Sequence, residues 1–158
     1  MKIDSDSVAA FKIHPGILFF ALLVLGESTH RMLPLGMGLE GLKFMQNVGI
    51  GLMAFGGLAM LLAFIAMVRA GTSIEPTKPS LKVVTNSIYA FSRNPVYVGY
   101  FLILVGRGLQ KNNILMMLCA ALLVTVMYWA VIRAEEAYLE AKFGTEYKMY
   151  KQKVRRWL

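Results

Sequence analysis

Residues 96–132 read VYVGYFLILVGRGLQKNNILMMLCAALLVTVMYWAVI, and this stretch decides the fold. As a single helix it would be about 55 Å long, nearly twice the roughly 30 Å hydrocarbon core of a bilayer. Its polar residues gather at the centre, between Arg107 and Asn113. The pattern therefore predicts a helical hairpin with arms near residues 95–109 and 113–134, which enters the membrane and returns to the side it left.

The composition of the whole chain supports a membrane location. Of its 158 residues, 57% are hydrophobic and 16% are charged, and the mean hydropathy is +0.56. A soluble domain of this length cannot shield so much apolar surface from water, and disorder needs a far less hydrophobic chain. One Cys and two His exclude a disulfide framework, a cysteine-based zinc site and a histidine metal cluster.

Two segments before the hairpin also have the length of a membrane span. Between residues 44 and 68 only Gln46 and Asn47 are clearly polar, which predicts a helix over 44–69. The segment near 14–36 is interrupted by polar residues and Pro34, and no cleavage site follows its apolar run, so we predict a retained helix rather than a signal peptide. The sequence thus predicts one all-α membrane domain over residues 1–158, an integral membrane bundle of about four transmembrane helices.

The basic residues predict the orientation of this bundle. Four crossings place both termini on one side of the membrane. The N-terminus, the 69–95 loop and the C-terminal tail together carry most of the 17 Lys and Arg residues. Cytoplasmic loops carry such an excess, so we predict that both termini and the 69–95 loop are cytoplasmic. The net charge of +8 then indicates affinity for anionic membrane lipids rather than nucleic-acid binding.

A stripe of small residues runs along the predicted helix over 44–69. Gly49, Gly56 and Ala63 recur every seven residues. Small residues let helix backbones approach closely in lipid. We expect the stripe to pack inside the monomer, and an oligomer interface through the same residues is the alternative.

The tail after Ile132 differs from the membrane segments. Charged residues there are interleaved with apolar ones at helical spacing, and Gly144 divides the segment. The pattern predicts a C-terminal pair of amphipathic helices over residues 135–157 on the cytoplasmic interface.

The first arm of the hairpin begins at Arg93-Asn94-Pro95. Asn before Pro is typical of a helix start, with Asn as the N-cap and Pro at the first helical position. Arg93 stands next to the free backbone N–H groups of that helix, and a guanidinium beside them makes an anion site. The alternative is an arginine that only reaches from the membrane into the interface.

The second arm ends at Glu135-Glu136, and a hairpin brings this pair to the same interface as Arg93. Adjacent carboxylates next to an apolar span favour a functional site, with a solvated helix end as the alternative. Together with the aromatic residues Tyr97, Tyr89 and Tyr147, these groups suit a ligand that carries both an anion and a cation.

Two stretches of this chain resemble the isoprenylcysteine carboxyl methyltransferase and phospholipid methyltransferase superfamily, in particular its small bacterial members. The first stretch contains Val84-Thr85, Tyr89, Arg93-Asn94-Pro95, Tyr97 and Gly99. The second contains Glu135-Glu136, Leu139, Phe143-Gly144, Tyr147, Tyr150 and residues 154–157. The resemblance covers about residues 69–158, and two motifs in order are more specific than either alone.

The resemblance implies an enzyme that uses S-adenosylmethionine and transfers a methyl group to a lipophilic acceptor. It implies a cofactor pocket lined by Tyr89, Arg93, Asn94, Pro95, Tyr97, Gly99, Glu135, Glu136 and Tyr147. In that pocket Arg93 could clamp the cofactor's carboxylate, and Glu135 or Glu136 could hold its cationic groups. Arg93 and Glu136 are the residues to which we assign a catalytic role. Methyl transfer needs alignment and exclusion of water rather than a dedicated nucleophile.

Some positions depart from the superfamily's pattern. Asn94 stands where the prenylcysteine enzymes usually have His, Ser87 replaces a usual Gly, and Ala90 a usual basic residue. Asn94 speaks against a prenylcysteine substrate more than against the cofactor. The departures at Ser87 and Ala90 favour an alternative, a non-enzymatic membrane scaffold of the same fold. A nicotinamide-dependent reductase of related architecture is a third hypothesis, against which the lack of a Gly-rich phosphate loop speaks. The methyl acceptor stays open among lipid amines, carboxylates, thiols and quinone-like hydroxyls.

Overall fold

The computed structural model describes residues 14–39, 41–72 and 80–158. All regular secondary structure in these ranges is helical, which confirms the all-α prediction. The α-helices are α1 (Pro15–Met32), α2 (Lys43–Ala70), α3 (Pro95–Lys111), α4 (Ile114–Met127), α5 (Arg133–Phe143) and α6 (Thr145–Lys153). A 3₁₀ turn (Ser87–Ala90) precedes α3, and a π-helical turn (Tyr128–Ile132) joins α4 to α5.

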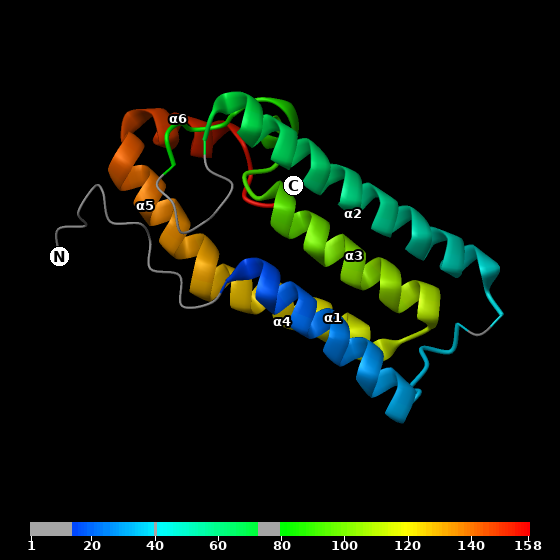
Figure 1. Cartoon of the computed structure of the whole chain (residues 1–158). Helices are drawn as coiled ribbons and strands as arrows, with labels where there is room; N and C mark the ends of the chain where they lie inside the picture. Colours follow the sequence, from blue (N-terminus) through cyan, green and yellow to red (C-terminus); the bar gives the residue numbers. More distant parts are fainter. Residues whose placement is uncertain (1–13, 40, 73–79) are drawn as a thin grey trace.

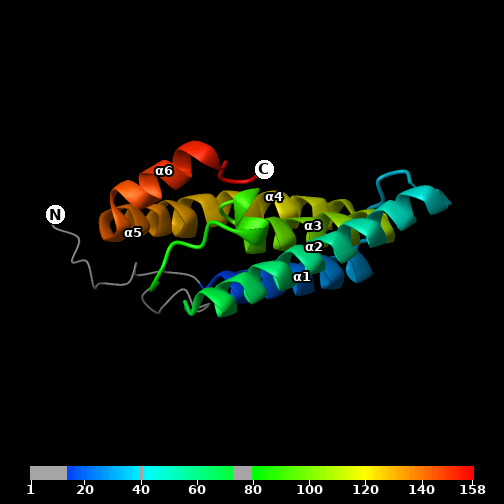
Figure 2. The same cartoon turned by 90° about the horizontal axis from the view of Figure 1, so that it is seen from above.

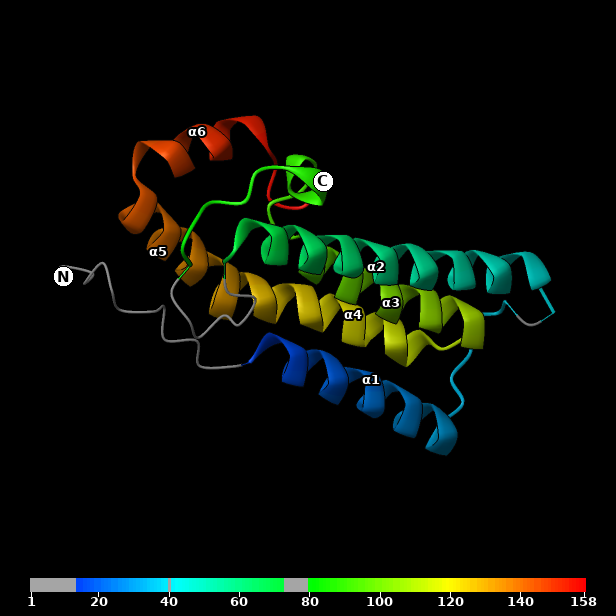
Figure 3. The ribbon, with the colours of Figure 1, turned by 45° about the horizontal axis from the view of Figure 1, so that its top comes forward.

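The first four helices lie side by side as a bundle (Figure 1). α2 packs mainly on α3, and α1 packs on α4. After α5 the chain turns back, so that α6 lies over α5 (Figure 2). The C-terminus therefore ends close to the start of α3 (Figure 3), where Arg93 N–H donates to the carbonyl of Arg155. This end of the bundle gathers the segments that carry both sequence motifs.

Two of the described helices are long and apolar enough to cross a membrane. They are α2 with 28 residues and the continuous helix Ile114–Phe143 with 30 residues. α1 stops at Met32 rather than near residue 36, because Pro34 disfavours a helical conformation in the residue before it. α3 has 17 residues. An all-helical bundle with two membrane-length helices is thus confirmed, and four crossings stay a prediction.

The predicted helical hairpin is confirmed as two helices joined by a short turn, while its passage through the membrane stays a prediction. Its arms are α3 and α4, joined by Asn112 and Asn113. Asn112 adopts a left-handed conformation (φ +52°), which asparagine tolerates better than most residues. The Asn113 side chain accepts a hydrogen bond from Met116 N–H (3.2 Å) and caps α4. Its amide also donates to the Gly26 carbonyl (3.0 Å), which ties the tip of the hairpin to α1.

The small-residue stripe of α2 packs against α3, as expected. Gly49, Gly56 and Ala63 are buried. A Cβ atom at Gly56 would lie 2.8 Å from the carbonyl oxygen of Gly99, so the two backbones are in direct contact. An oligomer interface through this stripe is therefore wrong, because α3 covers it.

The second arm does not end near residue 134, and this part of the prediction is wrong. The helix continues through the π-helical turn into α5, so residues 135–143 extend the membrane-length helix instead of forming a separate helix. No Gly or Pro lies between residues 114 and 143 to stop it. The helix ends at Gly144, the predicted stop, where φ is +54°. Of the predicted interfacial pair, α6 alone is a separate helix.

Ser87 occupies a backbone conformation that glycine favours. Its φ is +56°, and its side chain is exposed. Because a left-handed conformation costs an L-residue about 1–2 kcal/mol, we expect Ser87→Gly to raise the free energy of unfolding by about 0.5–1 kcal/mol after the added chain entropy of glycine. Thermal unfolding in detergent measures this. Ala90→Gly, in the same 3₁₀ turn without a positive φ, should lower stability instead, and a Ser87→Gly protein less stable than the wild type would contradict the explanation.

Candidate functional site

A cavity of about 500 Å³ lies at the end of the bundle where α3 begins and α5 leaves α4. This volume is typical of a small-molecule site. The walls come from α1, α2, α3, α5, α6 and the segment before α3. The polar and aromatic lining residues are His14, Phe64, Thr72, Ser80, Lys82, Tyr89, Arg93, Asn94, Tyr97, Tyr100, Glu135, Tyr138, Tyr147 and Tyr150. The hairpin thus brings residues of both motifs around one space.

Arg93 supplies a buried positive charge to the cavity wall. Its side chain is 9% exposed, and its Nη1 atom lies 3.0 Å from Glu136 Oε1 as an ion pair. Neither Nε nor Nη1 makes a well-aligned hydrogen bond within the described ranges. A buried guanidinium with unused N–H groups beside a cavity favours binding of an anion, and its planar fork matches a carboxylate.

Glu135 supplies the opposite charge. It lines the cavity, and its Oε2 atom accepts a hydrogen bond from the Tyr97 hydroxyl (3.2 Å). No Lys, Arg or His among the residues described in the structure forms an ion pair with Glu135. A half-buried carboxylate on a cavity wall without a cationic partner is costly, so the cavity favours a ligand that brings a positive charge.

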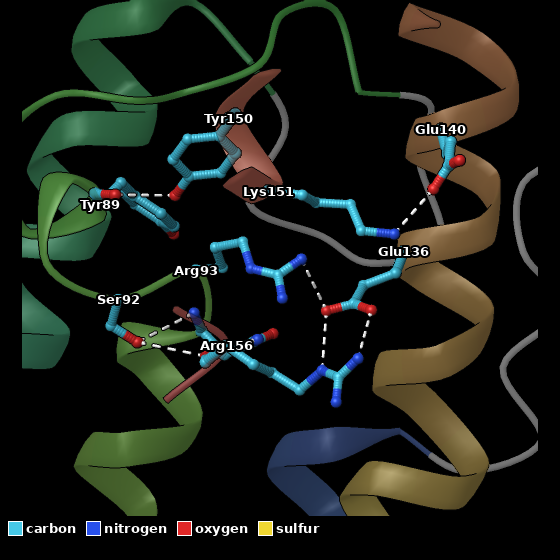
Figure 4. Close-up of polar contacts among 9 residues, drawn as sticks. Tyr89, Ser92, Arg93, Glu136, Glu140, Tyr150, Lys151 and Arg156 are labelled. Atoms are coloured by element: carbon cyan, nitrogen blue, oxygen red, sulfur yellow. Dashed lines mark hydrogen bonds and ion pairs between the residues drawn. The ribbon is translucent and has the colours of Figure 1, made fainter. Parts of the chain in front are cut away.

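Glu136 lies behind Arg93 and does not line the cavity. Its carboxylate accepts two hydrogen bonds from Arg156, from Nε at 2.9 Å and from Nη2 at 2.8 Å. Figure 4 shows Arg93 and Arg156 both directed at this carboxylate. Of the two adjacent glutamates, one therefore faces the cavity and the other holds two arginines.

The aromatic wall is held in place by a contact between α6 and the 3₁₀ turn. The Tyr150 hydroxyl donates to the Tyr89 carbonyl (2.7 Å), as Figure 4 shows. Burial raises the pKa of Tyr150 to about 12 and raises the pKa of Tyr147 and Tyr89 as well. These hydroxyls are therefore neutral near pH 7 and can act as hydrogen-bond donors in the site.

The remaining predicted residues lie at the start of α3. Asn94 and Pro95 line the cavity, and α3 begins at Pro95 as predicted. The Asn94 side chain does not cap α3, because its amide donates instead to the Arg156 carbonyl (2.9 Å). Gly99 faces α2 rather than the cavity: a Cβ atom there would lie 2.7 Å from the Gly56 carbonyl oxygen.

The structure adds residues that the sequence analysis did not single out. Tyr138 lines the cavity one helical turn after Glu135, and Arg156 pairs with Glu136. Glu135 and Tyr138 are three residues apart, a spacing that places both on one face of a helix. This spacing could have identified Tyr138 as a lining residue from the sequence. The pairing of Arg156 depends on how the tail folds back, for which the sequence offers no spacing rule.

Comparison with known proteins gives this arrangement a context. The sequence profile of the family described as phospholipid methyltransferase matches residues 44–146, well over half of the chain. The chain belongs to the phospholipid methyltransferase family. This confirms the resemblance found in the two motifs, and members of the family use S-adenosylmethionine. Together with the two membrane-length helices, membership indicates an integral membrane protein.

Several relatives share this similarity. The protein-S-isoprenylcysteine O-methyltransferase of Schizosaccharomyces pombe is 35% identical over 102 residues, 61% of this chain and 43% of that protein. The nickel-cobalt-cadmium resistance protein NccN of Alcaligenes xylosoxydans xylosoxydans is 31% identical over 96 residues, 61% of this chain and 45% of that protein. An uncharacterized protein of Haemophilus influenzae is 46% identical over 63 residues, 40% of this chain and 100% of that protein. The chain therefore matches less than half the length of the first two relatives, whose names differ. No solved structure matches.

Proposed function

We propose that this protein is an S-adenosylmethionine-dependent methyltransferase of the membrane that transfers a methyl group to a lipophilic acceptor. The observation that carries the proposal is the cavity that brings Arg93 and Glu135, one from each motif, to the wall of a single space. Family membership supports the same cofactor. The wider activity of the longer relatives is not assumed for this chain.

The lining residues fit the amino-acid end of S-adenosylmethionine. The unused N–H groups of Arg93 suit its carboxylate, and the unpaired Glu135 suits its ammonium group. The rings of Tyr97 and Tyr147 offer faces that attract a sulfonium cation. When bound, the cofactor supplies an electrophilic methyl group.

The chain's own residues orient the reactants and exclude water in this proposal. Tyr97 fixes Glu135 by a hydrogen bond, and the buried aromatic wall shields the cavity from solvent. Holding two reactants in line supplies much of the rate enhancement in such a displacement, so no nucleophilic side chain is required. In this proposal Glu136 acts through Arg93 and does not contact the ligand. Its role is therefore to position Arg93, and not the direct catalytic role that the sequence predicts for it.

A lipophilic acceptor is supported by the apolar part of the cavity. Phe64 and Met67 of α2 and Val96 of α3 line it. Phe64 is 50% exposed, on a helix whose outward residues are apolar, so this wall borders the surface that faces lipid. We propose that the acceptor enters from the bilayer through this side. α1 and α3 then cross together with the two longer helices, with both termini and the 69–95 loop in the cytoplasm.

The departures from the superfamily pattern do not favour the scaffold alternative. Ser87 and Ala90 are exposed and lie outside the cavity lining. Asn94 keeps its place in the wall and bonds to the tail. The residues proposed to bind the cofactor are thus unaffected by these substitutions.

Labelled methyl transfer tests the proposal. Purified protein is incubated with methyl-labelled S-adenosylmethionine and a total lipid extract, and labelled products are identified by mass spectrometry. We expect label in a lipid-soluble product, and a loss of more than about tenfold in Glu135→Gln. Glu146→Gln, an exposed carboxylate on α6, serves as the matched control and should match the wild type. Folded protein that shows neither cofactor binding in isothermal titration nor transfer would exclude the enzyme and favour the scaffold.

A further inference from the structure

Arg156 lies next to the candidate site without lining it. Its guanidinium binds both oxygens of Glu136, through Nε at 2.9 Å and Nη2 at 2.8 Å. The same guanidinium stands 5.2 Å from the ring centroid of Tyr128, within reach of a cation–π contact. The side chain of Arg156 is therefore held from two sides, by α5 and by the π-helical turn.

The contacts of Glu136 divide unequally between its two arginines. Arg156 takes the bidentate position, which is the strongest geometry for such a pair. Arg93 keeps a single ion-pair contact at 3.0 Å, without good hydrogen-bond alignment, and its Nε atom has no partner in the described ranges. Two guanidinium groups thus share one carboxylate, and the cluster carries one net positive charge, with Arg93 on its cavity side.

The backbone of the same tail segment fixes the position of Arg93. The Arg156 carbonyl accepts hydrogen bonds from the Asn94 amide (2.9 Å) and the Ser92 hydroxyl (3.5 Å). The Arg155 carbonyl accepts from Arg93 N–H (3.1 Å). Residues on both sides of Arg93 are therefore anchored by main-chain atoms of the tail, and these contacts do not depend on the side chain at position 156. Figure 4 shows Ser92 next to Arg156.

We propose that Arg156 is a positioning residue that sets the affinity of Arg93 for a carboxylate. By occupying Glu136, it prevents that carboxylate from forming a bidentate pair with Arg93 and neutralising it. Without the Arg156 side chain, Glu136 is free to take the N–H groups of Arg93 that the ligand needs. This inference rests on the proposed function, in which the ligand carboxylate belongs to the amino-acid part of S-adenosylmethionine.

Two ligands separate this role from a merely structural one. Isothermal titration of the full chain in detergent compares S-adenosylmethionine with methylthioadenosine, which lacks the amino-acid carboxylate. Arg156→Ala is expected to bind S-adenosylmethionine at least about tenfold more weakly, with affinity for methylthioadenosine unchanged within about twofold. Arg155→Ala is the matched control, because this neighbouring arginine is exposed, and it should bind both ligands like the wild type.

A second substitution tests the cause. In Arg156→Ala/Glu136→Gln no carboxylate is left to neutralise Arg93, so affinity for S-adenosylmethionine should recover most of the loss, while Arg156→Lys should lie between wild type and Arg156→Ala. Equal weakening of both ligands in Arg156→Ala, unchanged affinity for both, or no recovery in the double variant would overturn the inference. A folded wild type that binds methylthioadenosine but not S-adenosylmethionine also overturns it. A wild type that binds neither ligand overturns the proposed function itself.

Discussion

Replacing Arg93 by alanine should weaken binding of S-adenosylmethionine by about 1.5–3 kcal/mol, a loss of about 10- to 150-fold in affinity. The reason is the buried position of its guanidinium, whose Nε and Nη1 atoms have no well-aligned hydrogen bond in the described part of the chain. Alanine removes the buried positive charge of Arg93 from the cavity wall and leaves Arg156 as the arginine paired with Glu136. Isothermal titration of the purified protein measures the change.

The control for this prediction is Arg69→Ala. Arg69 lies in the last turn of α2, it is exposed, and it does not line the cavity. Both variants must show the same helical content by circular dichroism before their affinities are compared. If Arg93→Ala binds the cofactor as tightly as Arg69→Ala does, the carboxylate is not held at Arg93.

The largest expected effect on stability is at the contact between α2 and α3. A Cβ atom at Gly49 would overlap the carbonyl oxygen of Gly106 and lie 2.8 Å from the backbone nitrogen of Gln110. Both neighbours are backbone atoms and cannot rotate away, so Gly49→Ala must separate the helices. We expect it to lower the free energy of unfolding by about 1–3 kcal/mol or more, measured by thermal unfolding in detergent.

Gly51 provides the matched control two residues later on the same helix. Nothing lies within 4 Å of a Cβ atom built there, so Gly51→Ala should raise stability by up to about 1 kcal/mol through its helix propensity. A melting temperature for Gly49→Ala equal to that of Gly51→Ala would show that the two helices do not pack this closely.

Hydropathy and motif spacing predicted much of this architecture. The polar tip between Arg107 and Asn113 predicted the hairpin, and the hairpin predicted that residues near Arg93 and Glu135 would meet at one end of the bundle. Both follow from local rules, since apolar length sets the span and a turn reverses the chain. The contact of the small-residue stripe with another helix could also be predicted, because small residues that recur every seven positions indicate a close contact between helices.

Other features depend on information that the local sequence does not contain. The change in polarity after Ile132 predicts the end of a helix there, and this is wrong. Polarity indicates whether a residue is surrounded by lipid or water, whereas the helix itself ends at Gly144. Gly99 belongs to the first of the two family motifs, but it does not line the cavity. A glycine is needed there because the backbone of α3 lies directly against Gly56 of α2. The pairing of Arg156 with Glu136 requires the tail to fold back over α5, which follows from tertiary packing rather than from any local pattern.

The π-helical turn at Tyr128–Ile132 has a consequence for the two adjacent glutamates. Such a turn accommodates one extra residue, and each residue advances an α-helix by about 100°. If residues 114–143 formed an uninterrupted α-helix, every side chain beyond the turn would swing by about that angle, so Glu135 would face the arginines and Ala134 the cavity. The extra residue therefore decides which of two chemically identical neighbours faces the cavity, and any change that regularises the helix should replace the carboxylate in the cavity wall by the methyl group of Ala134.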